Sequence, residues 1–122
     1  MRTLVVDDHD SVRAILAAIL AEYGLDVVGV CADGREAIEA SRELRPDAVV
    51  MDVRMPVLDG IAATREIKEV SPTTRVVLLT AYEEEDLRTA ALAAGADEFV
   101  LKGISGQELA ALVRKQASCE AA

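Results

Sequence analysis

Aromatic residues are nearly absent from this sequence. Its 122 residues include two tyrosines, one phenylalanine and no tryptophan, so that aromatics form 2% of the chain. A core built on large aromatic side chains is therefore excluded. Because hydrophobic residues still make up 52% of the sequence, we expect one domain of common size with an aliphatic core.

Basic charge is also scarce. Lysine and arginine number 13 against 22 aspartates and glutamates, which gives a formal net charge of −9. Nucleic-acid-binding domains normally present a basic surface, so we expect this segment to make no direct contact with nucleic acid. The longest apolar run, from Ala14 to Ala21, is too short to cross a bilayer, and no signal peptide is evident. We expect no membrane association and a cytoplasmic location.

The usual nucleophilic and metal-binding residues are few. Two cysteines, Cys31 and Cys119, lack the paired spacing of a zinc site or a disulfide framework. Cys31 ends an apolar run and should be buried, whereas Cys119 should be exposed. The single histidine, His9, should lie in an exposed loop. No Ser–His–Asp or Cys–His arrangement, glycine-rich dinucleotide loop or Walker loop is recognisable, so these kinds of catalysis lack candidate residues.

Strand-like runs alternate with helix-like segments along the chain. We expect strands at Thr3–Val6, Leu25–Cys31, Ala48–Met51, Arg75–Leu79 and Glu98–Leu101. We expect helices from Val12 to Tyr23, from the cap Asp33 to about Arg45, from Gly60 after the cap Asp59 to Val70, from about Glu84 to Ala94 before Gly95, and from the cap Ser105 to about Ala117. This alternation predicts an α/β fold, with five parallel strands and helices on both faces. The first helix is apolar almost all round, which favours burial. A dimer contact through the first and last helices is the alternative.

Polar residues end four of the expected strands: Asp7 with Asp8, then Asp52, Thr80 and Lys102. Ligands of open parallel sheets bind at the carboxyl ends of the strands, so these residues should converge. Three carboxylates repel one another unless a cation neutralises them, and oxygen ligands favour a hard ion such as Mg²⁺. A lysine and a hydroxyl suit an anionic phosphoryl group. Since an aspartate can form an acyl phosphate, we predict Asp52 as a phosphoacceptor.

Several motifs occur in a fixed order at the strand ends. They are Val6-Asp7-Asp8-His9, the stretch from Val49 to Pro56 with Asp59-Gly60 after it, Leu78 to Ala81, Ala94 to Phe99, and Leu101-Lys102. Together they cover nearly the whole chain and resemble the receiver domain of two-component response regulators, in particular receivers of LuxR-type (NarL/FixJ-like) transcription factors. The resemblance implies a doubly wound, flavodoxin-like sheet with strand order 2-1-3-4-5. It also implies that a histidine kinase or a histidine phosphotransfer protein phosphorylates Asp52.

The same resemblance assigns roles to individual residues. The expected ligands of Mg²⁺ are Asp8, Asp52, the backbone carbonyl of Arg54, and Asp7, which would bind directly or through water. Lys102 would contact a phosphoryl oxygen. The domain would then be a signalling switch, whose only catalysis is Mg²⁺-dependent self-phosphorylation and autodephosphorylation.

Thr80 and Phe99 are the switch residues that the resemblance implies. Thr80 would move toward the phosphoryl group, and Phe99 would turn inward to fill the space that Thr80 leaves. Arg54 and Tyr82 flank the expected site, and we predict that they control how fast water reaches the acyl phosphate.

Residues 1–117 would form the receiver domain, and residues 118–122 a tail or the start of a linker. The resemblance implies regulation of transcription through a helix-turn-helix domain that this sequence lacks. A homodimer formed on phosphorylation is a possible further partner. Three alternatives stay open: a stand-alone receiver that acts through protein–protein interaction, an interaction module with a vestigial site, and a Mg²⁺-dependent phosphohydrolase with an aspartyl-phosphate intermediate. The phosphohydrolase would place a second aspartate where Arg54 stands.

The residue after Lys102 departs from the family pattern. Many receivers have proline there, joined by a cis bond, whereas this sequence has Gly103. Because a cis bond without proline costs about 2.5–4 kcal/mol, we expect a trans bond and a looser loop.

Overall fold

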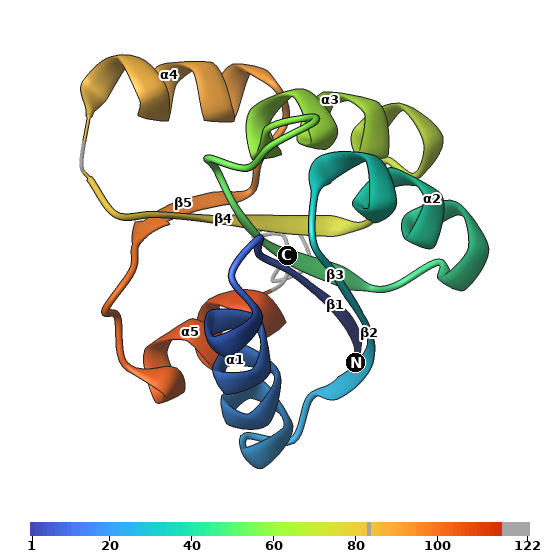
Figure 1. Ribbon diagram of the computed structural model, residues 1–122, viewed down its shortest axis with the longest axis vertical. Helices are drawn as coiled ribbons and strands as arrows, with labels where there is room; N and C mark the ends of the chain where they lie inside the picture. The colour runs from blue at the N-terminus through green and yellow to red at the C-terminus, as the bar shows by residue number, and fades with distance from the viewer. Residues whose placement is uncertain (83, 116–122) are drawn as a thin grey trace, which may run out of the picture.

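The computed structural model describes residues 1–82 and 84–115 (Figure 1). The chain forms β1 Arg2–Val6, α1 Asp10–Glu22, β2 Asp26–Cys31, α2 Gly34–Leu44, β3 Ala48–Asp52, α3 Gly60–Val70, β4 Arg75–Thr80, α4 Glu85–Ala93, β5 Glu98–Leu101 and α5 Gly106–Arg114. Every predicted strand and helix is present. The largest difference is at α5, which ends three residues before the predicted Ala117. The expected domain boundary at residue 117, the tail 118–122 and Cys119 lie outside the described residues.

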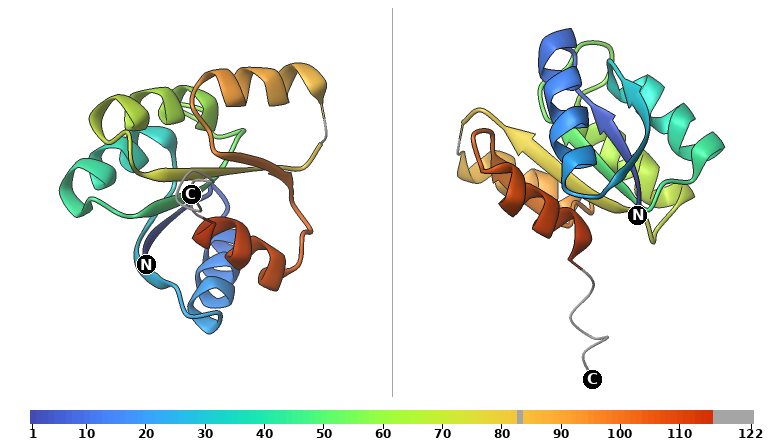
Figure 2. Two further views of the ribbon diagram at one scale, coloured as in Figure 1. Left: turned by 180° about the vertical axis from the view of Figure 1, so that it is seen from behind. Right: turned by 90° about the horizontal axis from the view of Figure 1, so that it is seen from below.

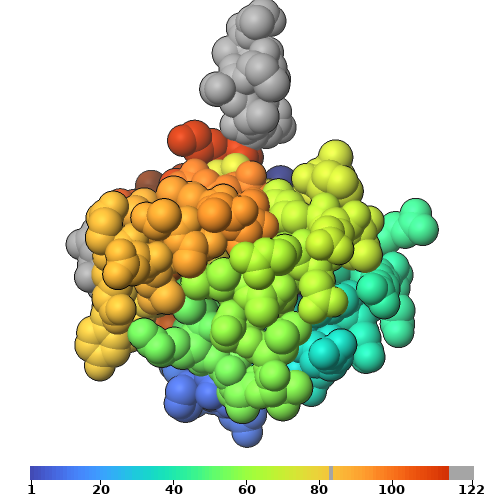
Figure 3. Space-filling model, turned by 90° about the horizontal axis from the view of Figure 1, so that it is seen from above, coloured from blue at the N-terminus to red at the C-terminus, as the bar shows by residue number. Residues whose placement is uncertain are grey.

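One parallel sheet, with strand order β2-β1-β3-β4-β5, forms the middle layer of the molecule. Helices α1 and α5 cover one face, and α2, α3 and α4 cover the other (Figures 1 and 2). Figure 3 shows α4, α3 and α2 lying side by side over that second face. The prediction of a doubly wound, flavodoxin-like α/β fold is confirmed. The winding changes direction between β1 and β3, which is where such sheets bind ligands.

The central strands are buried on both faces. Val49 and Met51 of β3 belong to the apolar cluster beneath α2 and α3, whereas Val50 belongs to the cluster against α1 and α5. Adjacent residues of a strand point to opposite faces, and here both faces are covered. This explains why the strand sequences are continuous apolar runs instead of alternating ones.

Helix α1 is less buried than its sequence predicts. Leu20 is its buried residue, whereas Ile15 is 57% exposed. The expectation of a buried helix is wrong because α1 lies at the side of its layer, next to α5 alone, and its outer side faces solvent. Within the described ranges, none of the helices has the length and apolar character needed to cross a membrane.

Helix ends follow the predicted signals closely. The side chains of Asp33, Asp59 and Ser105 each accept a hydrogen bond from the backbone N–H three residues later. Gly95 follows α4 with φ +107°, a left-handed conformation that favours glycine. The capping box at Ser105 is only half formed, since Glu108 Oε1 lies 3.2 Å from the Ser105 hydroxyl. These side-chain caps mark the starts of α2, α3 and α5, and Gly95 marks the end of α4.

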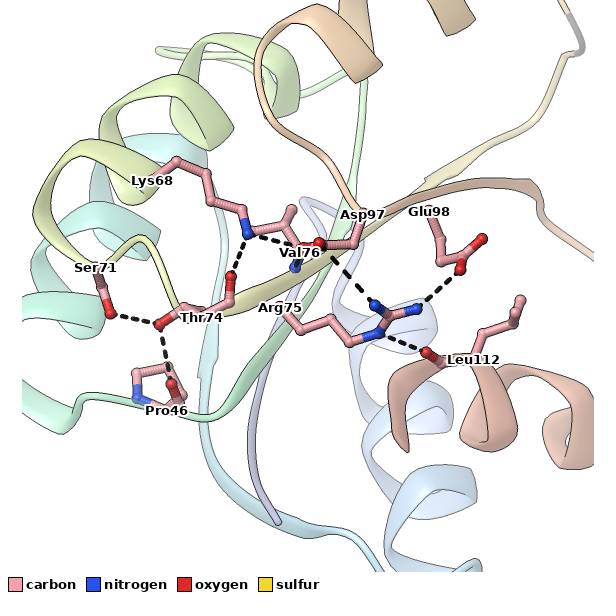
Figure 4. A network of polar contacts seen from close by, with 9 residues as sticks. All are labelled: Pro46, Lys68, Ser71, Thr74, Arg75, Val76, Asp97, Glu98 and Leu112. Atoms are coloured by element: carbon pink, nitrogen blue, oxygen red, sulfur yellow. Dashed lines mark hydrogen bonds and ion pairs between the residues drawn. The ribbon is translucent and has the colours of Figure 1, made fainter. Parts of the chain in front are cut away.

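A polar network joins α3, β4, β5 and α5 at the amino ends of the strands (Figure 4). Lys68 Nζ donates to the carbonyl of Thr74 at 2.7 Å and to Asp97 Oδ2 at 2.8 Å. The guanidinium of Arg75 donates to Glu98 and to the carbonyl of Leu112, both at 2.8 Å. The charged residues of this network therefore hold helices and strands together, at the edge of the sheet opposite the predicted phosphoacceptor.

Candidate functional site

Three of the predicted site residues meet at the carboxyl edge of the sheet. Asp7 directly follows β1, Asp52 is the last residue of β3, and Lys102 directly follows β5. Lys102 Nζ lies 3.2 Å from Asp7 Oδ2 and 3.2 Å from Asp52 Oδ2. The side chain of Asp7 is fully buried, whereas that of Lys102 is 29% exposed. One ammonium group is therefore shared by two largely buried carboxylates.

Backbone pairing continues past the strand ends and holds these residues in place. The N–H of Asp7 donates to the carbonyl of Cys31 at 3.1 Å, and the N–H of Lys102 donates to that of Thr80 at 2.7 Å. After Asp52, the N–H of Val53 donates to the carbonyl of Leu79 at 3.0 Å. The three charged side chains thus project from the edge of the sheet, where backbone hydrogen bonds to neighbouring strands hold the chain.

Asp8 and His9 extend the site beyond the sheet. His9 Nδ1 lies 3.2 Å from Asp8 Oδ1 and 3.4 Å from Asp7 Oδ1. Asp7, Asp8 and His9 each offer a ligand atom within 4.8 Å of the others. His9 is exposed, as predicted, but its contacts with both carboxylates were not expected from the sequence. They arise because His9 is the N-cap of α1, a helix that begins two residues earlier than predicted.

One oxygen of the site has no hydrogen-bond partner among the residues that the structure describes. Asp8 Oδ1 is buried and, despite its closeness to His9, forms no hydrogen bond of acceptable geometry. A buried carboxylate oxygen left unpaired is energetically costly. The arrangement fits a hard divalent cation, because such ions bind carboxylate oxygens and neutralise their charge. The donor set is therefore compatible with the predicted Mg²⁺.

The charges of the site shift the pKa values of two of its members. Burial raises the pKa of Asp52, and Asp7 and Asp8 add to that effect, while the Lys102 ammonium opposes it without cancelling it. Burial alone would lower the pKa of Lys102, but the carboxylates of Asp52 and Asp7 outweigh it and raise that pKa. The rise in the pKa of Asp52 thus comes mainly from burial, whereas the rise in the pKa of Lys102 comes from the carboxylates beside it.

A glycine that the sequence indicated only as a helix start also shapes the site. A Cβ atom on Gly60 would lie 2.2 Å from the carbonyl oxygen of Asp52. The Gly60 N–H donates to the carbonyl of Val53 at 2.7 Å, directly after the phosphoacceptor candidate. The start of α3 therefore packs on the backbone of Asp52. The Asp59-Gly60 pair was visible in the sequence, but this close approach of two backbones was not.

The two predicted switch residues lie beside the site. The hydroxyl of Thr80 donates to the carbonyl of Tyr82 at 3.0 Å and accepts from its N–H at 3.3 Å, so it is engaged with the next loop and not with Asp52. Phe99 is 3% exposed, and the Arg88 guanidinium lies 5.3 Å from its ring centre. Phe99 thus already occupies an inward position in this structure.

The segments around the site contain three further residues for which the sequence made a prediction, namely Arg54, Gly103 and Cys31. Arg54, whose backbone carbonyl is a predicted metal ligand, directs its side chain to Glu84, with Nη2 3.3 Å from Oε1. The bond between Lys102 and Gly103 is trans, as expected, and Gly103 has φ +98° with open space around it. Cys31 is buried, and burial raises the pKa of its thiol to about 11. It is therefore protonated at neutral pH and unsuited to nucleophilic chemistry.

Comparison with known proteins gives consistent matches along nearly the whole chain. The family described as response regulator receiver domain matches residues 3–114. Among solved structures, the signal receiver domain of the putative response regulator NarL from Mycobacterium tuberculosis has a TM-score of 0.88 and 34% identity, covering 92% of this chain and 91% of that one. A chain of the CheX-CheY-BeF₃-Mg²⁺ complex from Borrelia burgdorferi has a TM-score of 0.86 and 29% identity, covering 93% and 86%.

Similar curated proteins include two response regulators. Response regulator GacA of Pseudomonas viridiflava is 43% identical over 115 residues, which cover 93% of this chain and 54% of that protein. Response regulator protein VraR of Staphylococcus saprophyticus is 39% identical over 116 residues, which cover 94% and 56%. This chain thus spans about half the length of the curated relatives it matches.

Proposed function

Because the chain belongs to the response regulator receiver domain family, we propose that it is a two-component signalling switch that accepts a phosphoryl group on Asp52. The donor is a histidine kinase or a histidine phosphotransfer protein. The observation that carries this proposal is the position of Lys102 Nζ, 3.2 Å from both Asp52 and Asp7. A cation held there can neutralise a phosphoryl group bonded to Asp52.

A divalent cation, Mg²⁺, is part of the proposal. The residues that would hold it are Asp8, Asp52 and the backbone carbonyl of Arg54, with Asp7 binding directly or through water. When bound, the ion neutralises negative charge on the carboxylates and on the phosphoryl group. The unpaired, buried Oδ1 of Asp8 supports this assignment.

The chemical step requires little beyond positioned charge. A carboxylate oxygen of Asp52 forms the new bond to phosphorus while the bond from phosphorus to the donor histidine nitrogen breaks, and the electron pair leaves with the imidazole. The Lys102 ammonium, whose pKa is raised by Asp52 and Asp7 against the effect of burial, stays charged and donates to a phosphoryl oxygen. It also favours the ionised form of Asp52, which is the nucleophile.

Phosphorylation would then shift the population between two conformations of the domain. The Thr80 hydroxyl would exchange its two hydrogen bonds with Tyr82 for one to the phosphoryl group. Phe99 would keep the inward position that it has in this structure, next to the volume that Thr80 leaves. The β4–α4 connection would lose an attachment and move, which changes the surface presented to partners.

The output is proposed to be regulation of transcription in the cytoplasm. The curated relatives GacA and VraR are response regulators about twice as long as the matched segment, and the effector in this proposal is a DNA-binding domain outside that segment. A homodimer through α1 and α5 is supported by the exposed apolar side of α1 around Ile15. Analytical ultracentrifugation with and without a phosphoryl mimic tests it, and Ile15→Asp should abolish the dimer.

Other functions receive less support from the site. A phosphohydrolase would need an acid–base residue two positions after Asp52, but Arg54 stands there and pairs with Glu84. A stand-alone receiver would share the chemistry proposed here and differ only in its output. An interaction module with a vestigial site would not need the charges of Asp7, Asp8, Asp52 and Lys102 to be kept together.

Intact-mass measurement after incubation with acetyl phosphate and Mg²⁺ tests the central claim. We expect a gain of one phosphoryl group, lost on chelation of the metal and in Asp52→Asn. The control is Asp26→Asn, which removes an exposed aspartate at the start of β2 and should keep the gain. If the wild-type chain gains no mass, the interaction module becomes the better explanation. If Asp52→Asn still gains mass, the acceptor is a different residue.

A further inference from the structure

An ion pair joins the two loops that follow β3 and β4. Arg54 Nη2 lies 3.3 Å from Glu84 Oε1, with the two side chains 66% and 49% exposed. Since β3 and β4 are adjacent parallel strands, both loops leave the sheet at the edge that carries Asp52. The pair therefore links the loop of the phosphoacceptor to the start of α4.

Arg54 is close enough to Asp52 to serve a second partner. Two residues of extended chain span at most about 7 Å between Cα atoms, a distance that an arginine side chain can cover. A phosphoryl group carries more negative charge than the single carboxylate of Glu84, and its oxygens match the planar guanidinium in a two-pronged hydrogen bond. A phosphoryl group on Asp52 would therefore compete with Glu84 for Arg54.

Glu84 occupies an unusual position for the residue that would be released. It is the N-cap of α4, yet its side chain makes no capping hydrogen bond. His9 at the start of α1 makes none either, whereas Asp33, Asp59 and Ser105 cap the other three helices. Its side chain reaches Arg54 instead. The start of α4 is thus tied to the loop after Asp52 and not closed on its own helix.

We propose that the Arg54–Glu84 ion pair is a latch, which holds the start of α4 until a phosphoryl group on Asp52 takes Arg54 away. The proposal rests on the proposed function of Asp52. It adds an attachment that is independent of the hydrogen bonds between Thr80 and Tyr82. These two attachments, among the described residues of the β4–α4 connection, then end on side chains that the phosphoryl group attracts, so its arrival releases the connection at two points.

The latch predicts that removing the charge of Glu84 makes the active conformation easier to reach. Beryllium fluoride with Mg²⁺ is the probe, because it is a tetrahedral mimic of a phosphoryl group. We expect Glu84→Gln to bind the mimic roughly two- to fivefold more tightly. This change in affinity corresponds to the free energy that one exposed ion pair usually contributes. Without the mimic, amide resonances of residues 85–93 in this variant should move toward their positions in the mimic-bound wild type.

Glu85→Gln is the matched control, since Glu85 carries the same charge in the first turn of α4 while Arg54 pairs with its neighbour. Arg54→Gln completes the cycle: in its background, Glu84→Gln should change mimic affinity no more than Glu85→Gln does. Equal effects of Glu84→Gln and Glu85→Gln in wild-type background would mean a general charge effect and overturn the latch alone. A wild-type chain that neither binds the mimic nor gains a phosphoryl group overturns the proposed function, and the latch with it.

Discussion

Lys102 Nζ lies 3.2 Å from Oδ2 of Asp52, the carboxylate at the end of the central strand β3. The same nitrogen donates a hydrogen bond to Oδ2 of Asp7 at 3.2 Å. Lys102 follows β5, an edge strand that is separated from β3 by β4. Its side chain therefore extends past β4 to Asp52 at the end of β3 and to Asp7 after β1, and its positive charge interacts with both carboxylates.

Replacing this lysine should destabilise the protein through the acids that it leaves behind. We expect Lys102→Met to lower the free energy of unfolding at neutral pH by about 1–3 kcal/mol, the usual cost of a buried group that loses its partner. Urea denaturation measures it. Lys115→Met is the control, because Lys115 is exposed and lies 3.9 Å from Glu98, and its effect should stay within about 0.5 kcal/mol.

A second variant separates charge from shape in the same experiment. Adding Asp52→Asn to Lys102→Met removes one of the stranded carboxylates, so the double variant should be more stable than Lys102→Met alone. Residues in one ion-pair network typically show coupling of about 0.5–3 kcal/mol. If the two changes are simply additive, Lys102 and Asp52 are not coupled in solution.

The convergence of these residues could be predicted from sequence, whereas several of their contacts could not. Asp7, Asp52 and Lys102 each end an apolar run, and the carboxyl ends of parallel strands lie at one edge, so local patterns were sufficient. The contact between His9 and Asp8 depends on how the first turn of α1 leaves the sheet, which no periodicity specifies.

The same limit applies where two distant segments meet. The close approach of the Gly60 backbone to that of Asp52, which leaves no room for a Cβ at Gly60, depends on the path of a whole loop. Lys68 and Asp97 are 29 residues apart, and their pairing depends on the docking of α3 against β5. The exposure of α1 could not be inferred either, because an apolar helix at the side of a layer has the same sequence pattern as a buried one.

Asp52 should make stability depend on pH in a predictable direction. Burial raises its pKa in the folded chain, so the folded state binds this proton more tightly than the unfolded state does. Its contribution to stability is greatest in acid and is lost as the pH rises from the unfolded pKa through the raised folded pKa. Lys102, whose own pKa is raised, stabilises the fold fully at every pH below the ordinary lysine pKa, and that contribution is lost only as the pH rises from there through the raised value.

We therefore expect Asp52→Asn to be more stable than the wild type at neutral pH, and the difference to vanish in acid, where the carboxyl is protonated. Melting temperatures of both proteins measured from about pH 3 to about pH 8, a range that includes ordinary carboxyl pKa values, test this. The exposed Asp26→Asn should show no such trend. If Asp52→Asn were less stable than the wild type at neutral pH, the ion pair between Asp52 and Lys102 would contribute more to stability than the burial of the Asp52 carboxylate costs.

Magnesium should stabilise the folded protein if Asp8 is one of its ligands. An ion at about ten times its dissociation constant adds roughly 1.4 kcal/mol to the free energy of unfolding. We expect this gain in the wild type, measured as a rise in melting temperature that EDTA reverses. Asp8→Asn should lose most of the gain. Asp10→Asn is the matched control, because Asp10 lies two residues later with its side chain 94% exposed; a loss equal to that of Asp8→Asn would point to nonspecific screening.

Gly60 should be needed for phosphoryl uptake as well as for stability. In Gly60→Ala the added Cβ would lie 2.2 Å from the Asp52 carbonyl oxygen, so the backbone that carries the phosphoacceptor must shift. Such overpacking costs about 1–3 kcal/mol. A displacement of about 1 Å at a reacting group can slow a reaction on the order of a hundredfold, so the rate of mass gain with acetyl phosphate should fall by roughly ten- to hundredfold.

The control for this variant is Gly24→Ala, at the end of α1 and away from the acidic site. Gly24 has φ +89° and meets only the end of the Arg114 side chain at 2.9 Å. The substitution should cost about 1–2 kcal/mol through its left-handed backbone, which matches Gly60→Ala in stability without moving Asp52. If both variants slow phosphoryl uptake equally, the loss reflects stability alone. If only Gly60→Ala slows it, the contact between the start of α3 and Asp52 sets the position of the phosphoacceptor.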